Sequence, residues 1–398
     1  MVEIWGFGYG RILLVTMAAV AAVGIGLTTV FAQTAPPDAV AFDPVDPPAG
    51  ITAQAVFVED ANADSALYAL NPDERRSPAS TTKLMTALVI ANNTSDWQEL
   101  VTADPSDVLD PSDGESMIGL LDGDILTIEQ MMYGLMLNSG NDSAHAMARF
   151  VGAKLLAIEG AAGDPFERFV QEMNNTAANL GLQNTHFTNP SGLYDAEHYT
   201  SARDLAAIAS RAFEFPEIAT PSSVATYEFT SQGANPRVFT LQNTNKMLGE
   251  DGVIGGKTGT LMESGACLVV RLDQGDGNMV IGVVLGSDID FGEDQVQIPE
   301  TDQRFNDMRS IIGSMTQDYR WVQPGDADFP GLSQELSVWN VRLGDEHAIV
   351  LPAADTDSLR YLLQLGPPTQ PDAPVGTLLI FNGDQVVAER PVLQAGTA

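Results

Sequence analysis

Alternation of apolar and polar residues is the first regular feature of the chain. It runs through residues 54–58 and 65–70 on either side of the polar segment 60–64, and it predicts two paired strands. Apolar residues then recur at helical spacing. The helices expected from that spacing begin after Pro78 and at 127–137, 143–156, 166–180, 202–213 and 304–321. Together with the strand-like runs 266–272 and 279–286, this pattern predicts an α/β domain over residues 51–322.

The pattern changes at residues 323–331, which are rich in Pro, Gly and Asp and predict a linker. Beyond it the chain alternates in short runs, at 335–342, 347–351, 359–365 and 377–381. The dipeptide Asn382-Gly383 between two apolar runs predicts a β-hairpin. Residues 333–398 are therefore expected to form a small all-β domain.

The N-terminus has a different character. Residues 12–32 form an uncharged apolar run that ends at Ala32, with Val30 at the position three residues before the predicted cleavage point. This pattern favours a secretory signal peptide over residues 1–32. The run is also long enough to span a bilayer, so an uncleaved anchor is the alternative. Either interpretation places the Pro- and Asp-rich linker 33–50, and all that follows, outside the cytoplasm.

Charge and cysteine content exclude some partners and an intrachain disulfide. The net charge of −34 argues against nucleic acid or an anionic membrane surface as a partner. It also means that an anionic substrate would need local cations, and only four of the 19 basic residues are lysines. Cys267 is the single cysteine, so an intrachain disulfide is excluded. Since it lies in an apolar strand-like run, we expect it to be a small buried hydrophobe.

Two of the four lysines lie in motifs that suggest chemistry. Ser80 and Lys83 are three residues apart at the start of a predicted helix, so their side chains share one face. A serine hydroxyl becomes a nucleophile when a base accepts its proton, and a desolvated lysine can be that base. The alternative is a capping serine beside an exposed lysine. Arginine, which cannot deprotonate, carries most of the positive charge of this chain, and this favours a special role for Lys83.

Two further short motifs follow Ser80. Ser139-Gly140-Asn141 lies on a predicted tight loop between two helices, where turn chemistry alone would also explain it. Lys257-Thr258-Gly259 follows two glycines on a predicted strand, whose edge they leave open to a ligand. A strand loosened by glycines is the simpler explanation of the third motif. Each motif is weak alone, and the ordered set of three is strong.

Other catalytic classes find little support. The four histidines show no H-E-x-x-H or comparable spacing, and the chain has no G-x-S-x-G. The sequence therefore predicts neither a metal site nor a Ser-His-Asp triad, and we expect no cofactor. His145 follows Asn141 on a helix and is expected to be a packing residue.

The three motifs resemble the S-x-x-K, S-x-N and K-T-G boxes of the active-site serine penicillin-recognising enzymes. Within that group the chain is similar to the D-alanyl-D-alanine carboxypeptidases, the low-molecular-mass penicillin-binding proteins of peptidase family S11. The likeness extends from about residue 51 to the C-terminus and includes the stretches 137–144, 187–193, 199–205 and 256–259. It implies a β-lactamase/transpeptidase-like domain, in which helices pack on an antiparallel sheet, followed by a small all-β domain.

The resemblance also implies a role for each motif. Ser80 would be the acylated nucleophile, Lys83 its proton acceptor, and Ser139 a relay toward the leaving D-alanine. The substrate would be bound by Asn141 and by the third box with its next residue: Lys257, Thr258, Gly259 and Thr260. Lys257 and Thr258 would bind the terminal carboxylate, and the N–H groups of Ser80 and Thr260 would form an oxyanion hole.

These roles imply removal of the terminal D-alanine from peptidoglycan pentapeptide stems in the bacterial periplasm, and hence a part in cell-wall biogenesis and cell shape. β-Lactams would be covalent inhibitors. The chain departs from the family at Leu261–Gly265, where an aspartate is frequent. Its residues 391–398 do not predict the C-terminal amphipathic helix that many relatives carry, so we expect any membrane attachment to come from residues 12–32. The alternatives are a DD-endopeptidase acting on cross-links, a serine β-lactamase, and a non-catalytic cell-wall-binding scaffold.

Overall fold

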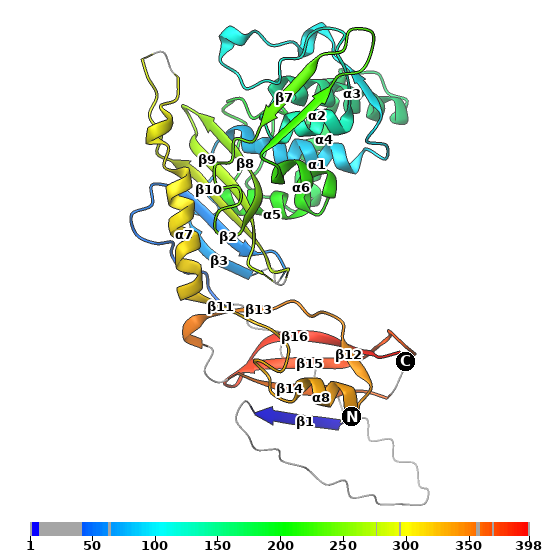
Figure 1. Cartoon of the computed structure of the whole chain (residues 1–398), viewed down its shortest axis with the longest axis vertical. Helices are drawn as coiled ribbons and strands as arrows, with labels where there is room; N and C mark the ends of the chain where they lie inside the picture. The colour runs from blue at the N-terminus through cyan, green and yellow to red at the C-terminus, as the bar shows by residue number, and fades with distance from the viewer. Residues whose placement is uncertain are drawn as a thin grey trace, which may run out of the picture. The chain divides into compact units, whose positions relative to one another are not determined.

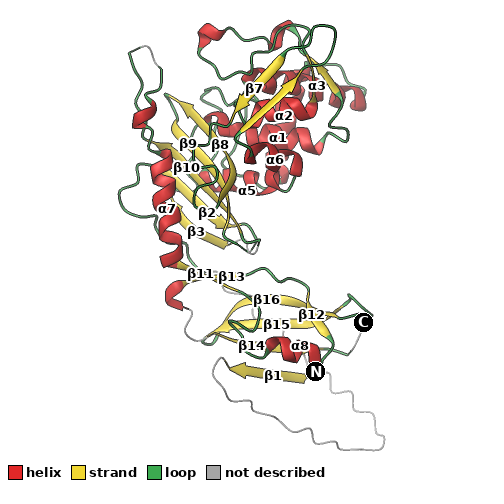
Figure 2. Ribbon diagram, in the orientation of Figure 1, coloured by secondary structure: helices red, strands yellow, loops and turns green. Residues whose placement is uncertain are grey.

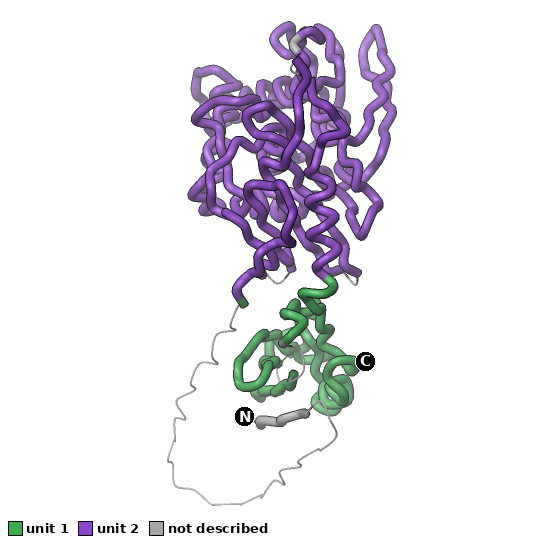
Figure 3. Tube along the Cα trace, turned by 90° about the vertical axis from the view of Figure 1, so that its left-hand side faces the viewer, with its two compact units in different colours: residues 1–42, 316–398 green, residues 43–315 purple. Residues whose placement is uncertain are grey.

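A computed structural model describes residues 2–7, 42–62, 65–275, 277–293, 296–355, 359–367 and 370–396 of the chain. The chain divides into two compact units, one of residues 43–315 and one of residues 1–42 with 316–398 (Figure 3). The sequence places the end of the first domain at residue 322, so the structural division comes earlier in the chain.

The larger unit is built on a five-stranded antiparallel sheet in the order β3-β2-β10-β9-β8. Its strands are β2 (Ala55–Asp60), β3 (Ser65–Leu70), β8 (Val253–Leu261), β9 (Gly265–Asp273) and β10 (Met279–Ser287). The predicted pairing around residues 60–64 is confirmed, because Val56 lies opposite Leu70 and Asp60 opposite Ser65. Strand β8, which carries the K-T-G motif, is at the edge of the sheet.

Helices cover both faces of this sheet (Figures 1 and 2). Helix α5 (Ala202–Phe213) packs on β2 and β10. Helix α7 (Arg304–Asp318) lies on the other side, where Met308 is so close to Gly282 of β10 that a Cβ on Gly282 would lie 3.0 Å from the Met308 sulfur. The apolar core is continuous through α1 (Lys83–Asn92), in which residues 83–91 are all buried.

The helices of the larger unit are α1 (Lys83–Asn92), α2 (Ile128–Met136), α3 (Asn141–Glu159), α4 (Pro165–Asn179), α5 (Ala202–Phe213), α6 (Pro216–Ser223) and α7 (Arg304–Asp318). The predicted helices form close to their expected spans, and α2, α4 and α5 have side-chain caps. Thr127 and Gln130 form a capping box at α2, and Ser201 caps α5 through the Asp204 N–H. These caps are why the sequence locates the helix starts well.

Several short elements of the described chain were not predicted. They are the two-stranded sheets β4 (Leu100–Thr102) with β5 (Ile125–Thr127) and β6 (Thr226–Thr230) with β7 (Val238–Gln242), helix α6, and the 3-10 turns η1 (Ala79–Thr82), η2 (Pro105–Asp107), η3 (Pro111–Asp113), η4 (Pro299–Thr301) and η5 (Ala353–Asp355). Strands of three to five residues carry too few alternating positions to stand out.

Two predicted helix boundaries are wrong in detail. Asn141 is the first residue of α3 rather than a loop residue, so this helix begins two residues before the predicted start at 143. The last helix ends at Asp318, not Trp321, because Tyr319–Val322 pairs as β11 with β13 (Ile349–Pro352). A helix and a strand joined without a turn residue give no sequence signal at their junction.

The smaller unit has a five-stranded antiparallel sheet in the order β1-β14-β15-β16-β12. Its strands are β1 (Val2–Phe7), β12 (Val341–Leu343), β14 (Leu359–Leu365), β15 (Pro374–Asn382) and β16 (Gln385–Gln394). The predicted hairpin at Asn382-Gly383 is confirmed. The strand predicted over 335–342 is wrong. Helix α8 (Leu332–Val338) forms there, since Leu332 and Leu336, four residues apart, both pack on the core.

Residues 2–7 form β1, which pairs with β14, within the segment assigned above to a signal peptide. This differs from the expectation that the N-terminus lies outside the fold. The apolar run 12–32 lies outside the described residues, so its assignment stays a prediction. Within the described part of the chain, no helix is long and apolar enough to cross a membrane.

Candidate active site

Ser80 lies in the tight 3-10 turn η1, directly before α1. The residue before it, Ala79, has φ of 47°, a left-handed conformation that costs a non-glycine residue about 1–3 kcal/mol. The turn is held in place from outside. At Gly192 a Cβ would lie 1.9 Å from the Ala79 carbonyl oxygen, so only glycine permits this contact. The strained backbone therefore lowers the stability of the fold while it holds Ser80 at one fixed position.

Lys83 is fully buried beneath Ser80. Its Nζ donates to Ser80 Oγ at 2.9 Å, to Asn141 Oδ1 at 2.6 Å and to the Ser191 carbonyl oxygen at 2.7 Å. Burial lowers the pKa of Lys83 to about 7, against the opposing effect of the Glu115 and Asp142 carboxylates. This geometry excludes the alternative of an exposed lysine. An amine that is partly neutral near pH 7 can accept a proton from the neighbouring hydroxyl.

Ser139 and Lys257 form a second buried pair. Lys257 Nζ donates to Ser139 Oγ at 2.9 Å and to the Thr258 carbonyl oxygen at 2.9 Å, and only 1% of the lysine is exposed. Ser139, like Ala79, has a left-handed backbone, with φ of 57°. Burial, and then the positive charges of Lys83 and Arg304, hold the pKa of Lys257 well below its usual range.

Strand β8 passes directly beside the nucleophile turn. A Cβ on Gly259 would lie 2.8 Å from Ser80 N and 2.9 Å from Pro78 O, so any larger residue would force the strand away. Thr260, the next residue, lines the same cleft as Ser80. The hydroxyls of Thr258 and Thr244 share a hydrogen bond of 2.6 Å.

A cleft of about 330 Å³ opens above these groups. Five predicted site residues line it, namely Ser80, Ser139, Thr258, Gly259 and Thr260. The three others, Lys83, Asn141 and Lys257, are buried and contact Ser80, Ser139 or each other. The structure therefore brings all eight predicted residues together.

Arg304 is a cleft residue that the sequence analysis missed. It is 3% exposed and donates to the carbonyl oxygens of Gly259 at 2.7 Å and Cys267 at 3.0 Å and to the Thr260 hydroxyl. One signal in the sequence could have identified it. A positive charge in the first turn of a helix is unfavourable because it faces the positive end of the helix dipole. An arginine at such a position therefore indicates a role outside its own helix.

Three other residues that sequence reasoning left aside support the site. The Asp142 carboxylate accepts hydrogen bonds from the N–H groups of Ile118, Gly119 and Leu120. Glu115 accepts from Asn141 Nδ2 at 2.7 Å. His198 Nε2 bonds Thr82 Oγ1 at 2.9 Å, and burial lowers the pKa of this histidine to about 4.

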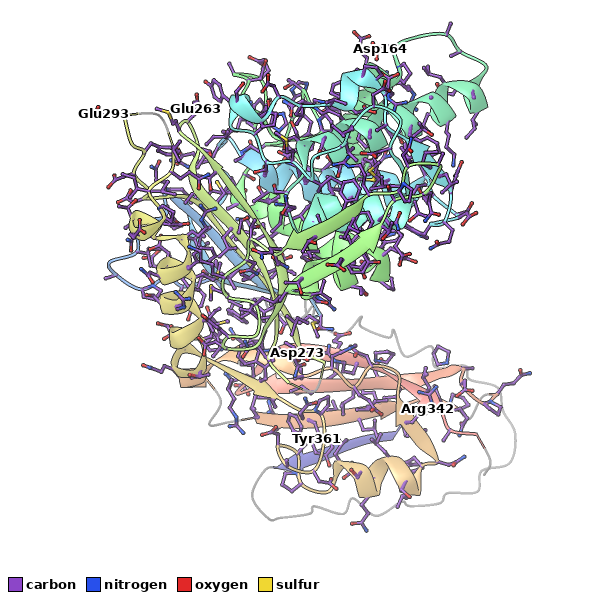
Figure 4. All side chains as sticks on the ribbon, turned by 45° about the horizontal axis from the view of Figure 1, so that its top comes forward. Asp164, Glu263, Asp273, Glu293, Arg342 and Tyr361 are labelled. Carbon is purple, nitrogen blue, oxygen red and sulfur yellow. The ribbon has the colours of Figure 1, made fainter. Side chains whose placement is uncertain are left out.

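The remaining candidates have structural roles. Cys267 is fully buried in β9, and burial raises the pKa of its thiol, which confirms its assignment as a small buried hydrophobe. His145 packs edge-on against Phe166. The segment Leu261–Gly265, which departs from the family pattern, runs from the last residue of β8 to the first of β9 and includes the turn between them, and Figure 4 labels Glu263 there. Among the described residues, no cluster of His, Cys, Asp and Glu side chains could hold a metal ion.

An activated serine, two buried lysines and an antiparallel sheet covered by helices define the chain as a penicillin-binding serine peptidase by its fold. The family model described as D-alanyl-D-alanine carboxypeptidase, Peptidase_S11, matches residues 43–289. The chain belongs to this family, and it is a serine-type DD-carboxypeptidase. The resemblance inferred from the three motifs is thus confirmed.

Individual relatives agree with the family match. The D-alanyl-D-alanine carboxypeptidase DacF of Bacillus subtilis is 30% identical over 359 residues, which cover 85% of this chain and 83% of the relative. The D-alanyl-D-alanine carboxypeptidase of Streptomyces sp. (strain K15) is 36% identical over 228 residues, 56% of this chain and 76% of the relative.

Solved structures extend the likeness to the fold. The crystal structure of the Streptomyces K15 DD-transpeptidase superposes with a TM-score of 0.57 at 31% identity and covers 68% of this chain and all (100%) of that one. Penicillin-binding protein 5 from Haemophilus influenzae gives a TM-score of 0.63 at 22% identity and covers 88% of this chain and 98% of its own. At that identity the second match supports the fold alone. The predicted fold class is confirmed.

Proposed function

We propose that the chain removes the terminal D-alanine from peptidoglycan pentapeptide stems through an acyl-enzyme on Ser80. The observation that carries this proposal is the 2.9 Å hydrogen bond between Lys83 Nζ and Ser80 Oγ at a buried lysine whose pKa is lowered to about 7. A general base whose pKa lies near the working pH is often unprotonated and still binds a proton strongly enough to remove it from the nucleophile.

In the acylation step, neutral Lys83 accepts the Ser80 proton while Oγ attacks the carbonyl carbon of the penultimate D-alanine. The developing oxyanion is stabilised by the N–H groups of Ser80 and Thr260, a contribution typically of about 3 kcal/mol per donor. The close approach of Gly259 to Ser80 N supports this pairing, because it brings β8 beside the turn.

The tetrahedral intermediate then expels the terminal D-alanine, whose amine must gain a proton. Ser139 Oγ, which accepts from Lys257 Nζ, supplies that proton. The proton that Lys83 took from Ser80 replaces it, directly or relayed through Lys257, so Lys83 is neutral again. Water attacks the resulting ester while Lys83 accepts its proton, and Lys83 then returns that proton to Ser80 Oγ as the C–O bond of the ester breaks. This releases the shortened peptide and restores both Ser80 and the neutral base. No cofactor or metal ion enters any of these steps.

Substrate binding is assigned to the strand wall of the cleft. The peptide lies along the edge of β8, with its carboxylate toward Lys257 and Thr258 and its amide toward Asn141. A carboxylate at hydrogen-bond distance raises the pKa of Lys257, because an opposite charge favours the ammonium form. β-Lactams would acylate Ser80 in the same position.

Intact-mass analysis with benzylpenicillin tests the nucleophile. One adduct is expected, on the peptide that contains Ser80, and none in Ser80→Ala. An undiminished adduct in Ser80→Ala would overturn the assignment. Product analysis on muropeptides then separates the outcomes. Release of free D-alanine supports the carboxypeptidase, cleavage of dimers supports an endopeptidase, and penicillin turnover without peptide cleavage supports a β-lactamase.

The acyl acceptor is a second question that the relatives raise. The Streptomyces K15 enzyme is named as a DD-transpeptidase in its structures and as a carboxypeptidase among curated proteins. An amine in place of water would give transpeptidation from the same acyl-enzyme. Adding an amino acid acceptor to the peptide assay measures this, since transfer product at the expense of free acid would assign this chain the transferase reaction as well.

We also propose that the chain acts in the periplasm after export, with residues 1–32 removed and 33–50 as a linker before the peptidase domain 51–322 and the β domain 333–398. The alternative is a tether through residues 12–32. N-terminal sequencing of exported protein distinguishes these, because processing predicts a start near Gln33. An intact N-terminus in the membrane fraction would support the tether.

A further inference from the structure

The loop that precedes α2 is fixed to the first turn of α3, at the mouth of the cleft. Asn141 N donates to the Ser116 carbonyl oxygen at 2.8 Å, and Asn138 Nδ2 donates to the Met117 carbonyl oxygen at 2.6 Å. The Asp142 carboxylate binds the next three N–H groups of the loop. These bonds hold Glu115 at one place, and its carboxylate accepts from Asn141 Nδ2 at 2.7 Å.

A continuous chain of hydrogen bonds therefore runs from Glu115 to the nucleophile. It passes from Glu115 to Asn141 at 2.7 Å, from Asn141 to Lys83 at 2.6 Å and from Lys83 to Ser80 at 2.9 Å. Glu115 belongs to none of the three sequence motifs. We propose that Glu115 is a positioning residue for acylation, which holds the Asn141 amide in the one orientation that leaves the lone pair of Lys83 free for the Ser80 proton.

The need for such a residue follows from the chemistry of the amide. An ammonium group only donates, so protonated Lys83 by itself directs the Asn141 oxygen toward Nζ. A neutral amine has a lone pair and can also accept. Once Lys83 has lost its proton, the NH2 group of Asn141 could turn to bond this lone pair, which would occupy the base at the moment it is needed.

Glu115 prevents this rotation because a carboxylate only accepts hydrogen bonds. It keeps the NH2 group of Asn141 on its own side and so keeps the oxygen on the side of Lys83. One hydrogen of the NH2 group is engaged by Glu115, and the other stays available to a substrate carbonyl. The proposal rests on the assignment of Ser80 and Lys83 made above.

Glu115 also acts on Lys83 through its charge. Among the groups that oppose the lowering of the Lys83 pKa, its carboxylate comes first and Asp142 second. The other ionisable groups that interact with Lys83 are cations or potential cations: Lys257, His145 and His198. Removing the Glu115 charge should therefore lower the proton affinity of Lys83 and extend activity toward lower pH.

The test measures acylation by a fluorescent penicillin, and kcat/KM on a D-Ala-D-Ala peptide, from pH 4 to 10 in the full chain. Glu115→Ala should lower the plateau by about tenfold, the scale of a lost hydrogen bond to a charged group. Glu115→Gln should lose less, because its amide can still accept from Asn141. In both variants the acid limb of the profile should move to lower pH.

A double-mutant cycle with Asn141→Ala isolates the route of the effect. In that background, Glu115→Ala should cost less than about twofold on the plateau, since the amide it orients is gone, while the shift of the acid limb persists. Asp122→Asn removes an exposed carboxylate from the same loop and is the matched control, for which neither change is expected.

Each outcome has one meaning. An unshifted acid limb, together with equal losses for Glu115→Ala in both backgrounds, would overturn the positioning role. Faster acylation in Glu115→Ala would mean that Glu115 instead obstructs the Asn141 amide, which also overturns it. If Ser80→Ala still forms an adduct, the proposed function fails first. If Ser80 is labelled but the Glu115 variants behave like Asp122→Asn, only the present inference fails.

Discussion

The two walls of the cleft each bury one lysine, and the two lysines have different surroundings. On the helical wall, Lys83 lies within reach of two carboxylates, Glu115 and Asp142, which partly offset its desolvation and leave its pKa at about 7. On the strand wall, Lys257 is equally buried, but the charges that act on it are the cations Lys83 and Arg304.

This difference suits the two lysines to the opposite tasks proposed for them. A group that exchanges protons during every turnover needs both protonation states within reach, which is the situation of Lys83. A lysine that binds an anion gains most binding energy when the anion itself favours the ammonium form. This is the case when no carboxylate of the protein already holds the lysine in that form. Burial alone would make the two residues alike, so it is the neighbouring charges that separate a base from a binding group.

The largest effect is expected at the base. Lys83→Arg keeps the positive charge but cannot deprotonate, so acylation should fall by at least about a hundredfold. Penicillin labelling rates measure this, with Lys154→Arg, a lysine paired with Glu99 at the surface, as the matched control. If Lys83→Arg is labelled at a rate near that of the parent, the lysine has a structural role. The different charges around Lys83 and Lys257 would then not distinguish a base from a binding residue.

A smaller loss is expected at the binding lysine, and it should depend on the substrate. Lys257→Ala removes the charged partner of the terminal carboxylate, so kcat/KM for the free-acid peptide should fall by about tenfold to a hundredfold. The same peptide with an amidated C-terminus should be hydrolysed poorly by the parent and be little affected by the substitution. Equal cleavage of acid and amide by the parent would favour the endopeptidase.

The sequence predicted those site residues whose positions depend on spacing along the chain. The i, i+3 relation of Ser80 and Lys83 puts both on one helical face wherever the helix lies, and capping residues such as Ser201 mark helix starts directly. Ser139 was placed correctly near a turn, although Asn141 proved to be helical. The edge position of Lys257 followed from its glycines.

What the sequence could not provide depends on contacts between distant segments. Glu115 matters because the loop before α2 is fixed to α3, and Arg304 matters because α7 packs beside β8. Neither relation has a fixed spacing along the chain. The strand predicted over 335–342 failed for the same reason, since the packing of Leu332 and Leu336 on their own core decides in favour of a helix.

The pH dependence of the stability of the fold gives a third test of the protonation state of Lys83. Lys83 has a pKa of about 7 in the folded chain and an ordinary value of 10.5. Between these pH values the unfolded lysine binds a proton that the folded one does not, so the cost of burying Lys83 is full below pH 7 and disappears above 10.5.

The free energy of unfolding of the parent, relative to Lys83→Met, should accordingly rise by at most about 1.4 kcal/mol per pH unit across this range. Denaturant titrations at pH 7, 8 and 9 measure the difference, and Lys154→Met serves as the control. A difference that stays flat over these pH values would mean that Lys83 remains charged in the folded protein, against its proposed role as base.

The smallest effect concerns long-range charge. The chain carries −34, whereas Lys246 and Arg304 line the cleft together with Asp302, and Lys257 lies buried beside it. Distant repulsion and local attraction therefore act together on a carboxylate substrate. Salt screens the distant charges most strongly, since the Debye length is about 10 Å at 0.1 M. Going from low ionic strength to 0.1 M should thus raise kcat/KM for the free-acid peptide by about twofold and leave the amide nearly unchanged. A fall for the free acid would mean that the cations of the strand wall already dominate at a distance, and that the acidic surface has no influence on how substrate reaches the cleft.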